Sequence, residues 1–254
     1  MSRRAVRAPI DGLRSGEVEL PAATARYLRR VHRLGPGDHF VAFDPDAVLE
    51  ADAELLPSDV RRARARLGEP RPGSLRPERL VTLLQAMGKG DKLDAVVRDA
   101  TELGVSRLQP VVAQRSVRRP GRAETQVGRW QRIAVQAARQ CGRGDAPAIL
   151  PPADLAAALH GLGTLGPTVL GLCLHPEADE PIGTVLRERG ACGPVIVLCG
   201  PEGGLTADEI ALARSLGFRI VTLGPLVLRT ETACAAVMGA LLAFSSLAVA
   251  SRDA

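Results

Sequence analysis

Aromatic side chains are scarce in this sequence of 254 residues, which holds four Phe, one Tyr and one Trp. A core must therefore be built from aliphatic residues, and a hydrophobic content of 46% is enough for one. Long apolar runs are missing too. Ala233–Ala250 comes nearest to a membrane span, but it is rich in Ala and Ser, and we expect a buried helix there. The N-terminal MSRRAVRAPIDG lacks the apolar segment of a signal peptide, so we expect a cytoplasmic protein.

Paired cysteines and metal-ligand spacings are also missing from the sequence. The five cysteines form an odd set without a C-x-x-C pair. Such a set is typical of reduced thiols and argues against a disulfide framework or a zinc site. The four histidines show no metal-ligand spacing either. We therefore expect no bound metal.

Lysine is almost absent, since Lys89 and Lys92 are the only two and the other basic residues are arginines. The arginines are unevenly distributed. Between Val112 and Arg143 there are eight arginines and a single acid, Glu124, so this segment carries +7 against +5 for the whole chain. Such a local concentration of positive charge is typical of a surface that binds a polyanion.

The sequence changes in texture near residue 72. Before it, short runs such as His39–Phe43 and Val48–Leu55 alternate with turn signals, which predicts a small β-rich module with a helix at Ala23–Leu34. Three prolines and two glycines within Gly68–Arg79 indicate a linker. From Leu80 onward, strands alternate with helices, the pattern of a mostly parallel sheet. We therefore expect an α/β protein with domains at 1–72 and 73–254.

Two glycine motifs are weak indications of phosphate binding. Gly161, Gly163 and Gly166 match G-x-G-x-x-G, but a predicted helix precedes them and a strand follows. This order is the reverse of the dinucleotide fingerprint and disfavours a nucleotide-dependent oxidoreductase. GKGDK (88–92) lies between a strand and a helix, where backbone N–H groups can hold a phosphate. Solvated lysines and a polyanion contact are both consistent with it.

Two later joints between a strand and a helix carry stronger signals. VIVLCGPEGGLTADEI (Val195–Ile210) ends an apolar strand in a loop with three glycines, and its Thr206 and Glu209 match a capping box. LGPLVLRTETACAA (Leu223–Ala236) adds a Gly-Pro turn, a guanidinium, two hydroxyls and a carboxylate. Both joints follow strands that are consecutive in the sequence and predicted to be parallel. We expect them to form one site at the carboxyl edge of the sheet.

The motifs LCGPEGGLTADEI and LGPLVLRTETA, in that order, resemble the signature of the ribosomal RNA small subunit methyltransferase E family, which belongs to the SPOUT class of RNA methyltransferases. KGDKLDAVVRDATELGV, PVVAQRSVRR and RWQRIAVQAARQCGRGDAPAI extend the resemblance from about Leu80 to Ala240. YLRRVHRLGPGDHFVAFD resembles, more loosely, the PUA-like RNA-binding domain of that family. Three features depart from the pattern: Arg139 stands for an acid, Cys141 stands for a serine, and DPDAVLEADAEL lacks a glycine-containing turn.

The resemblance implies S-adenosyl-L-methionine-dependent methylation of N3 of one uridine in 16S rRNA, within the 30S subunit. It also implies a C-terminal trefoil knot around the cofactor and a homodimer. Arg229 would stabilise the uracil anion, and Glu202 or Glu231 would accept the proton. The predicted cofactor-binding residues are Leu198, Cys199, Gly200, Glu202, Gly203, Gly204, Leu223, Gly224, Leu228, Arg229, Thr230, Thr232 and Ala233.

The basic residues of the arginine-rich segment, of the N-terminal module and of GKGDK are the predicted RNA footprint. They are Arg29, Arg30, Arg33, Lys89, Lys92, Arg115, Arg118, Arg119, Arg139 and Arg143. Two alternatives stay open. One is another SPOUT enzyme, acting on tRNA or on a ribose 2′-hydroxyl. The other is a non-catalytic RNA-binding protein of ribosome assembly, which would bind RNA but not S-adenosylmethionine.

Overall fold

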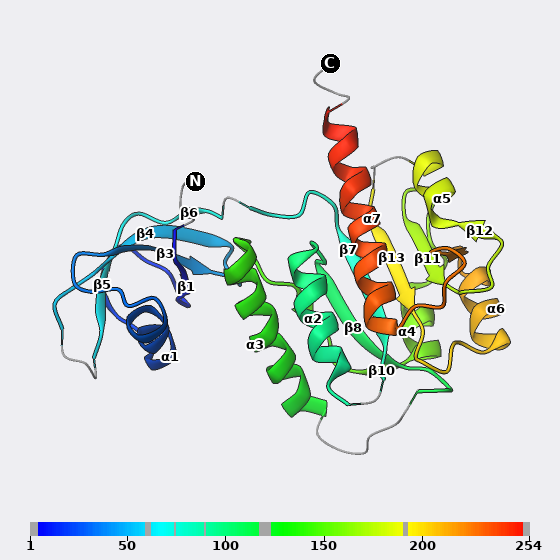
Figure 1. Cartoon of the computed structure of the whole chain (residues 1–254), viewed down its shortest axis with the longest axis horizontal. Coiled ribbons are helices and arrows are strands. Elements are labelled where there is room, and N and C mark those ends of the chain that lie inside the picture. The colour runs from blue at the N-terminus through cyan, green and yellow to red at the C-terminus, as the bar shows by residue number, and fades with distance from the viewer. Residues whose placement is uncertain are drawn as a thin grey trace. The chain divides into compact units, whose positions relative to one another are not determined.

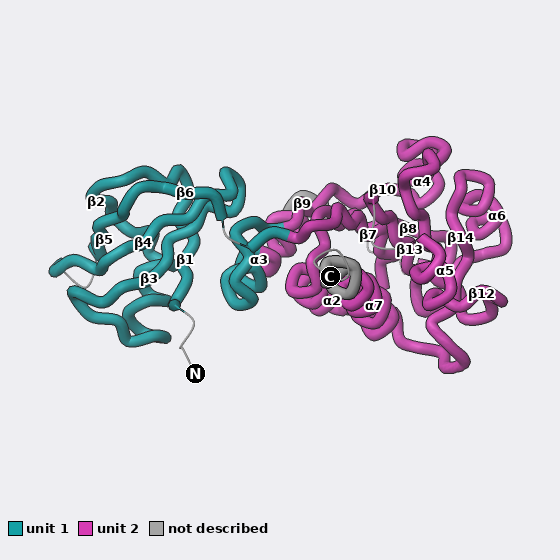
Figure 2. Tube along the Cα trace, turned by 90° about the horizontal axis from the view of Figure 1, so that it is seen from above, with its two compact units in different colours: residues 1–76, 135–146 teal, residues 77–134, 147–254 magenta. Residues whose placement is uncertain are grey.

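A computed structural model of the chain describes residues 5–58, 62–73, 75–88, 90–116, 123–189 and 193–250, except for the side chains of 123–125 and 245–250. The chain forms two compact units, which Figure 2 shows in different colours. Unit 1 comprises Met1–Arg76 and Val135–Ala146, and unit 2 comprises Pro77–Ala134 and Pro147–Ala254.

The division differs from the single boundary expected at residue 72, because Val135–Ala146 groups with unit 1. Contacts within the unit explain this. The Arg139 guanidinium lies over the Tyr27 ring, 3.6 Å from its centroid. The Gly144 N–H donates to the Leu75 carbonyl at 2.9 Å. Arg143 is only 6% exposed and pairs with Asp145 at 2.9 Å. The side chain of Arg139, which the sequence suggested for RNA, therefore helps to hold this segment within unit 1.

Unit 1 is built on a six-stranded sheet in which β3 and β4 form the central hairpin. The strand order is β1-β3-β4-β5-β2, with β6 paired to β4. The predicted helix at 23–34 is shorter than expected and changes type, with α1 at Ala22–Arg26 running into the π-helical η1 at Tyr27–Val31. The strands are β1 Arg7–Pro9, β2 Gly16–Glu19, β3 His39–Asp44, β4 Leu49–Leu55, β5 Arg64–Leu67 and β6 Arg71–Pro72.

The hairpin between β3 and β4 contains an unusual backbone conformation. Val48 has φ 55°, in the left-handed region where glycine is favoured and β-branched residues are rare. This is the segment in which the family resemblance led us to expect a glycine-containing turn. The Asp44 carboxylate organises the turn by accepting from the N–H groups of Asp46 and Ala47, both at 3.0 Å.

Unit 2 contains an eight-stranded sheet whose strands pair in parallel, so the predicted α/β class is confirmed (Figure 1). The strand order is β10-β8-β7-β13-β11-β14-β12, with β9 beside β8. Aliphatic side chains fill its centre, and every residue of β13 is buried. The strands are β7 Val81–Ala86, β8 Arg107–Val112, β9 Ala148–Ile149, β10 Ala153–Asp154, β11 Leu170–Leu174, β12 Glu180–Pro181, β13 Val195–Cys199 and β14 Phe218–Thr222.

Helices cover both faces of this sheet. α7 packs against α2 and α5, while α4 packs against α6. Figure 2 shows α2 and α7 together on one side of the strands and α4 on the other. The Asp154 carboxylate caps α4, and the predicted capping box of Thr206 and Glu209 is present at α6. The helices that lie wholly in unit 2 are α2 Lys92–Glu102, α4 Leu155–Leu162, α5 Ile182–Arg189, α6 Ala207–Ser215 and α7 Thr230–Ala250, whereas α3 Ala123–Cys141 begins in unit 2 and ends in unit 1.

The C-terminal helix α7 has a buried face, as the sequence suggested. Cys234, Val237, Met238 and Leu241 are each at most 2% exposed, whereas Leu242 is half exposed. Among the residues that the structure describes, no helix combines the length and the apolar character that crossing a membrane requires.

Candidate functional site

A cavity of about 330 Å³ opens at the carboxyl ends of β11, β13 and β14. Ligand pockets in proteins measure about 300–1,000 Å³. This is the edge at which open α/β sheets bind ligands. Both loops that the sequence singled out, 200–204 and 223–233, contribute to its wall. The cavity therefore lies where the sequence placed a site.

The sheet brings the two loops together in a way that the sequence did not reveal. β13 and β14 follow one another in the chain, but β11 lies between them and pairs with both. The two loops therefore follow strands that are consecutive in the sequence, as expected, but that are not neighbours in the sheet. The end of β11 and the segment after it reach the same site, where Leu174, His175 and Pro176 line the cavity.

The loop after β13 is a tight turn. The Gly204 N–H donates to the Pro201 carbonyl at 2.9 Å, which places Glu202 and Gly203 at the tip. Gly204 has φ 72°, a conformation that requires glycine. A Cβ on Gly200 would lie 3.1 Å from Leu205 Cγ, so this position is also tightly packed. The glycines thus shape a turn that a side chain would distort.

The joint between β14 and α7 is tied to that turn by a hydroxyl. Thr230, the first residue of α7, donates from Oγ1 to the Gly200 carbonyl at 2.9 Å. The same hydroxyl accepts from Gln85 Nε2 at 2.9 Å. Gln85 is the penultimate residue of β7, pairs with Cys199 in the sheet and is 1% exposed. One threonine therefore connects β7, the loop after β13 and the start of α7.

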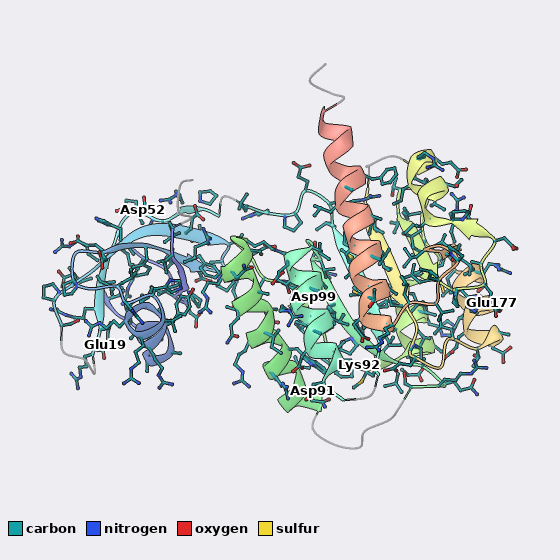
Figure 3. The ribbon with its side chains drawn as sticks, in the orientation of Figure 1. Glu19, Asp52, Asp91, Lys92, Asp99 and Glu177 are labelled. Carbon is teal, nitrogen blue, oxygen red and sulfur yellow. The ribbon has the colours of Figure 1, made fainter. Side chains whose placement is uncertain are left out.

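A charged cluster lies beside the cavity. Lys92 Nζ is 2.8 Å from Glu202 Oε1 and 3.9 Å from Glu231 Oε2. Figure 3 shows Lys92 at the start of α2, beside the first turn of α7. The hydrogen bond to Glu202 raises the pKa of Lys92 above its usual 10.5, so the ammonium stays charged at neutral pH. A Cβ on Gly88 would lie 2.7 Å from Glu202 Oε1, so that glycine leaves room for the carboxylate.

Cys199 contributes a neutral thiol to the cavity wall. A hydrogen bond with Cys234, together with complete burial, raises the pKa of Cys199 well above its usual value. A neutral thiol of this kind acts as a small apolar group. Among the described residues, no cluster of three or more His, Cys, Asp or Glu side chains could hold a metal ion.

Most of the predicted cofactor residues line the cavity, and four do not. Leu198 is buried in the core of the sheet, and Gly203 faces Arg115 instead. Thr232 is exposed, and neither it nor Gly224 reaches the wall. Of the candidate catalytic residues, Glu202 and Arg229 line the cavity, whereas Glu231 does not. The predicted residues in the wall are Cys199, Gly200, Glu202, Gly204, Leu223, Leu228, Arg229, Thr230 and Ala233.

The wall also contains residues that sequence reasoning missed. Some of these residues lie at or just after the C-terminal end of β11. The polar HPE sequence that follows this strand could have indicated that the strand end contributes to the site. Leu226 and Val227 are 74% and 83% exposed and form the tip of the loop before α7. The missed residues are Leu174, His175, Pro176, Pro201, Leu205, Val221, Thr222, Leu226 and Val227.

The predicted RNA-contacting residues fall into different environments. Arg30 and Arg33 are exposed, and Arg29 donates to Ser58 Oγ at 2.8 Å. Arg143 is buried in unit 1 and pairs with Asp145, which disfavours the expected phosphate contact. Lys92 is engaged by Glu202, and Arg115 by a backbone carbonyl. Lys89, Arg118 and Arg119 lie outside the described residues.

Comparison with known proteins identifies the family. Residues 76–242 match the model of the RNA methyltransferase domain. A ribosomal RNA small subunit methyltransferase E from Synechocystis is 32% identical over 92% of this chain and 75% of its own length. The protein of that name from Mycobacterium bovis is 33% identical over 83% of this chain and 80% of its own length.

Solved structures agree with the sequence relatives. A ribosomal RNA small subunit methyltransferase E from Neisseria gonorrhoeae, bound to S-adenosyl methionine, superposes with a TM-score of 0.83 at 30% identity and covers 94% of this chain and 98% of its own. A putative methyltransferase from Legionella pneumophila, in complex with the same cofactor, also gives 0.83, at 27% identity over 95% and 98% of the two chains. The chain belongs to the ribosomal RNA small subunit methyltransferase E family.

Proposed function

We propose that this protein methylates N3 of a specific uridine in 16S rRNA of the small ribosomal subunit, using S-adenosyl-L-methionine. The observation that carries the proposal is the cavity at the carboxyl ends of β11, β13 and β14, in a chain of this family. Relatives with the same fold are bound to S-adenosylmethionine.

The lining residues fit this cofactor in size and chemistry. Leu223, Leu226 and Leu228 supply apolar surface suited to an adenine ring. The backbone of the Gly200–Gly204 turn supplies peptide groups without bulky side chains. The bound cofactor would supply an electrophilic methyl group on a sulfonium.

The chain's own residues would position the uracil and move its proton. The neutral imide is a poor nucleophile, so the N3–H bond must break as the N3–CH₃ bond forms. Arg229 lines the cavity and would stabilise the negative charge that develops on the uracil carbonyl oxygens. The N3 proton passes to a carboxylate, directly or through water.

Glu202 is the better placed of the two candidate proton acceptors, because it lines the cavity. Its ion pair with Lys92 weakens it as a base, so we expect anion stabilisation by Arg229 to contribute more than proton removal. Glu231, in the first turn of α7, lies close to Lys92 and would balance the positive charge of the Lys92 ammonium.

We further propose that unit 1 is a PUA-like RNA-binding domain and that unit 2 is a knotted SPOUT domain acting as a homodimer. The chain path supports the knot. After β14 the chain returns past the loop that follows β13, and α7 then packs against α2. An enzyme that acts on the 30S subunit would work in the cytoplasm.

Incubation with labelled S-adenosylmethionine and undermodified 30S subunits, followed by nucleoside analysis, tests the proposal. The expected product is 3-methyluridine in 16S rRNA. Label on a ribose hydroxyl or in tRNA would identify a different SPOUT activity. RNA binding without cofactor binding would indicate an assembly protein instead.

A further inference from the structure

A short turn follows β8 at the start of the arginine-rich segment. The Ser116 N–H donates to the Ala113 carbonyl at 2.9 Å, and the Ala113 N–H donates back to Ser116 Oγ at 3.1 Å. These bonds close the turn and leave Gln114 and Arg115 at its tip. The tip is therefore ordered by the turn itself and can hold a neighbouring segment.

The tip of this turn contacts the loop after β13 at one point and the first turn of α6 at another. Arg115 Nη1 donates to the Gly203 carbonyl at 3.0 Å. The Gln114 N–H donates to Glu209 Oε1 at 2.7 Å. The other oxygen of Glu209 accepts from the Thr206 N–H at 2.8 Å, as a capping-box carboxylate does. The Glu209 carboxylate thus binds the end of the cavity loop through one oxygen and the 113–116 turn through the other.

Close packing accompanies these hydrogen bonds. A Cβ on Gly203 would lie 3.1 Å from Arg115 Cβ and 3.6 Å from its Cδ. The aliphatic stem of Arg115 therefore covers the outer side of the glycine turn. Gly203 is required by this contact and not by the cavity, whose wall it does not reach.

We propose that Arg115 is a positioning residue for the cofactor loop. By holding the Gly203 carbonyl, it fixes the peptide that leads to Gly204, and Gly204 lines the cavity. Thr230 holds the same loop at the Gly200 carbonyl, and Lys92 holds it at Glu202. A phosphate contact alone would require neither the packing on Gly203 nor the bond between Gln114 and Glu209. The inference rests on the proposed function, because it assigns Arg115 to the S-adenosylmethionine site.

Three full-length variants separate positioning from phosphate binding. Arg115→Met keeps the apolar stem and removes the donors, and Arg115→Lys restores one cationic donor. Arg132→Met is the matched control, because the Arg132 Nε donates only one turn back to the Gly128 carbonyl of its own helix. For each variant, calorimetry gives the S-adenosylmethionine Kd, steady-state kinetics give its KM and kcat, and filter binding gives the salt dependence of affinity for 16S rRNA.

We expect Arg115→Met to raise the Kd and KM for S-adenosylmethionine about 3- to 10-fold, the effect of losing one hydrogen bond. The kcat at saturating cofactor should stay near that of the wild type. Arg115→Lys should recover part of the affinity, and Arg132→Met should change neither constant. The log–log salt slope of Arg115→Met should match the wild type, whereas a lost phosphate contact would reduce it by about 0.7–0.9.

A wild-type Kd in Arg115→Met would overturn the inference while leaving the proposed function intact, and so would an equal loss of affinity in Arg132→Met. Failure of the wild-type protein itself to bind S-adenosylmethionine would instead overturn the proposed function and this inference with it. Unfolding midpoints of all variants show whether a loss of affinity reflects misfolding, and recovery in Arg115→Lys excludes it.

Discussion

Thr230 Oγ1 donates a 2.9 Å hydrogen bond to the carbonyl oxygen of Gly200, thirty residues earlier in the chain. This bond joins the first turn of α7 to the loop after β13. The hydroxyl also accepts from the buried Gln85 amide, so one side chain fixes three segments around the cavity. The polar residues of the Leu223–Ala236 joint therefore do more than cap a helix, because Thr230 also binds the loop after β13 and β7.

Removing the Thr230 hydroxyl should loosen the cavity. Thr230→Val keeps the shape but removes the donor to the Gly200 carbonyl and leaves Gln85 Nε2 with the Ala86 carbonyl at 3.2 Å as its remaining acceptor. We expect a loss of about 1–3 kcal/mol in the free energy of unfolding, with weaker binding of S-adenosylmethionine. Urea denaturation measures the free energy of unfolding, and calorimetry measures the affinity for S-adenosylmethionine. Thr232→Val is the control, because Thr232 is exposed and outside the cavity wall. Equal effects of the two substitutions would contradict this role.

Replacing Val48 with a residue that tolerates a positive φ should stabilise the protein. Its φ of 55° is strained for a β-branched residue, whereas glycine and asparagine tolerate it. We expect Val48→Gly and Val48→Asn to raise the free energy of unfolding by about 0.5–1 kcal/mol, since relieved strain exceeds the added chain entropy. Ala47→Gly, in the same turn, should lower it. Denaturant unfolding that shows Val48→Gly less stable than the wild type would rule out strain at this position.

Asp44 should make stability depend on pH in the acid range. Burial acts to raise the pKa of Asp44, but hydrogen bonds from the N–H groups of Ala47, Gly12 and Asp46 outweigh it, and the net pKa falls below the usual 3.8. Because the folded pKa is depressed, the stabilisation is complete above 3.8 and is lost as pH falls through the folded value. Asp44→Asn should therefore be less stable than the wild type at neutral pH, with a difference that shrinks in acid. A difference independent of pH would exclude the carboxylate charge as its source.

The RNA footprint should include the exposed Arg30 and Arg33 but not the buried Arg143. Replacing Arg30 and Arg33 with alanine should reduce the log–log salt slope of 16S rRNA binding by about 1.4–1.8, two phosphate contacts, without a loss of stability. Arg143→Met should instead lower stability and leave the slope unchanged, because Arg143 pairs with Asp145 inside unit 1. A reduced salt slope with unchanged stability in Arg143→Met would show instead that Arg143 belongs to the RNA footprint. The RNA contacts expected of Lys89, Arg118 and Arg119 stay predictions, because these residues lie outside the described part of the chain.

Local pattern was sufficient to predict the main strands and helices of unit 2, because apolar periodicity and capping residues act over a few positions. The Thr206–Glu209 box and the glycine loop after β13 are examples. The same reasoning could not place β11 between β13 and β14, because strand order depends on packing far along the chain. His175 and Gln85 were missed for that reason. Arg115 and Arg143 show a second limit, since a charge count cannot tell a free guanidinium from one that holds a carbonyl or a carboxylate.

The central claim is that methyl transfer takes place in the cavity between the 200–204 and 223–233 loops. Single-turnover methylation of 30S subunits by Arg229→Ala, at saturating S-adenosylmethionine, tests it most directly. Loss of one anion-stabilising donor should cost about 2–4 kcal/mol in the chemical step, with little change in cofactor or RNA affinity. Arg229→Lys should recover only part of the rate, because it lacks the planar fork. A wild-type rate in Arg229→Ala would contradict the account.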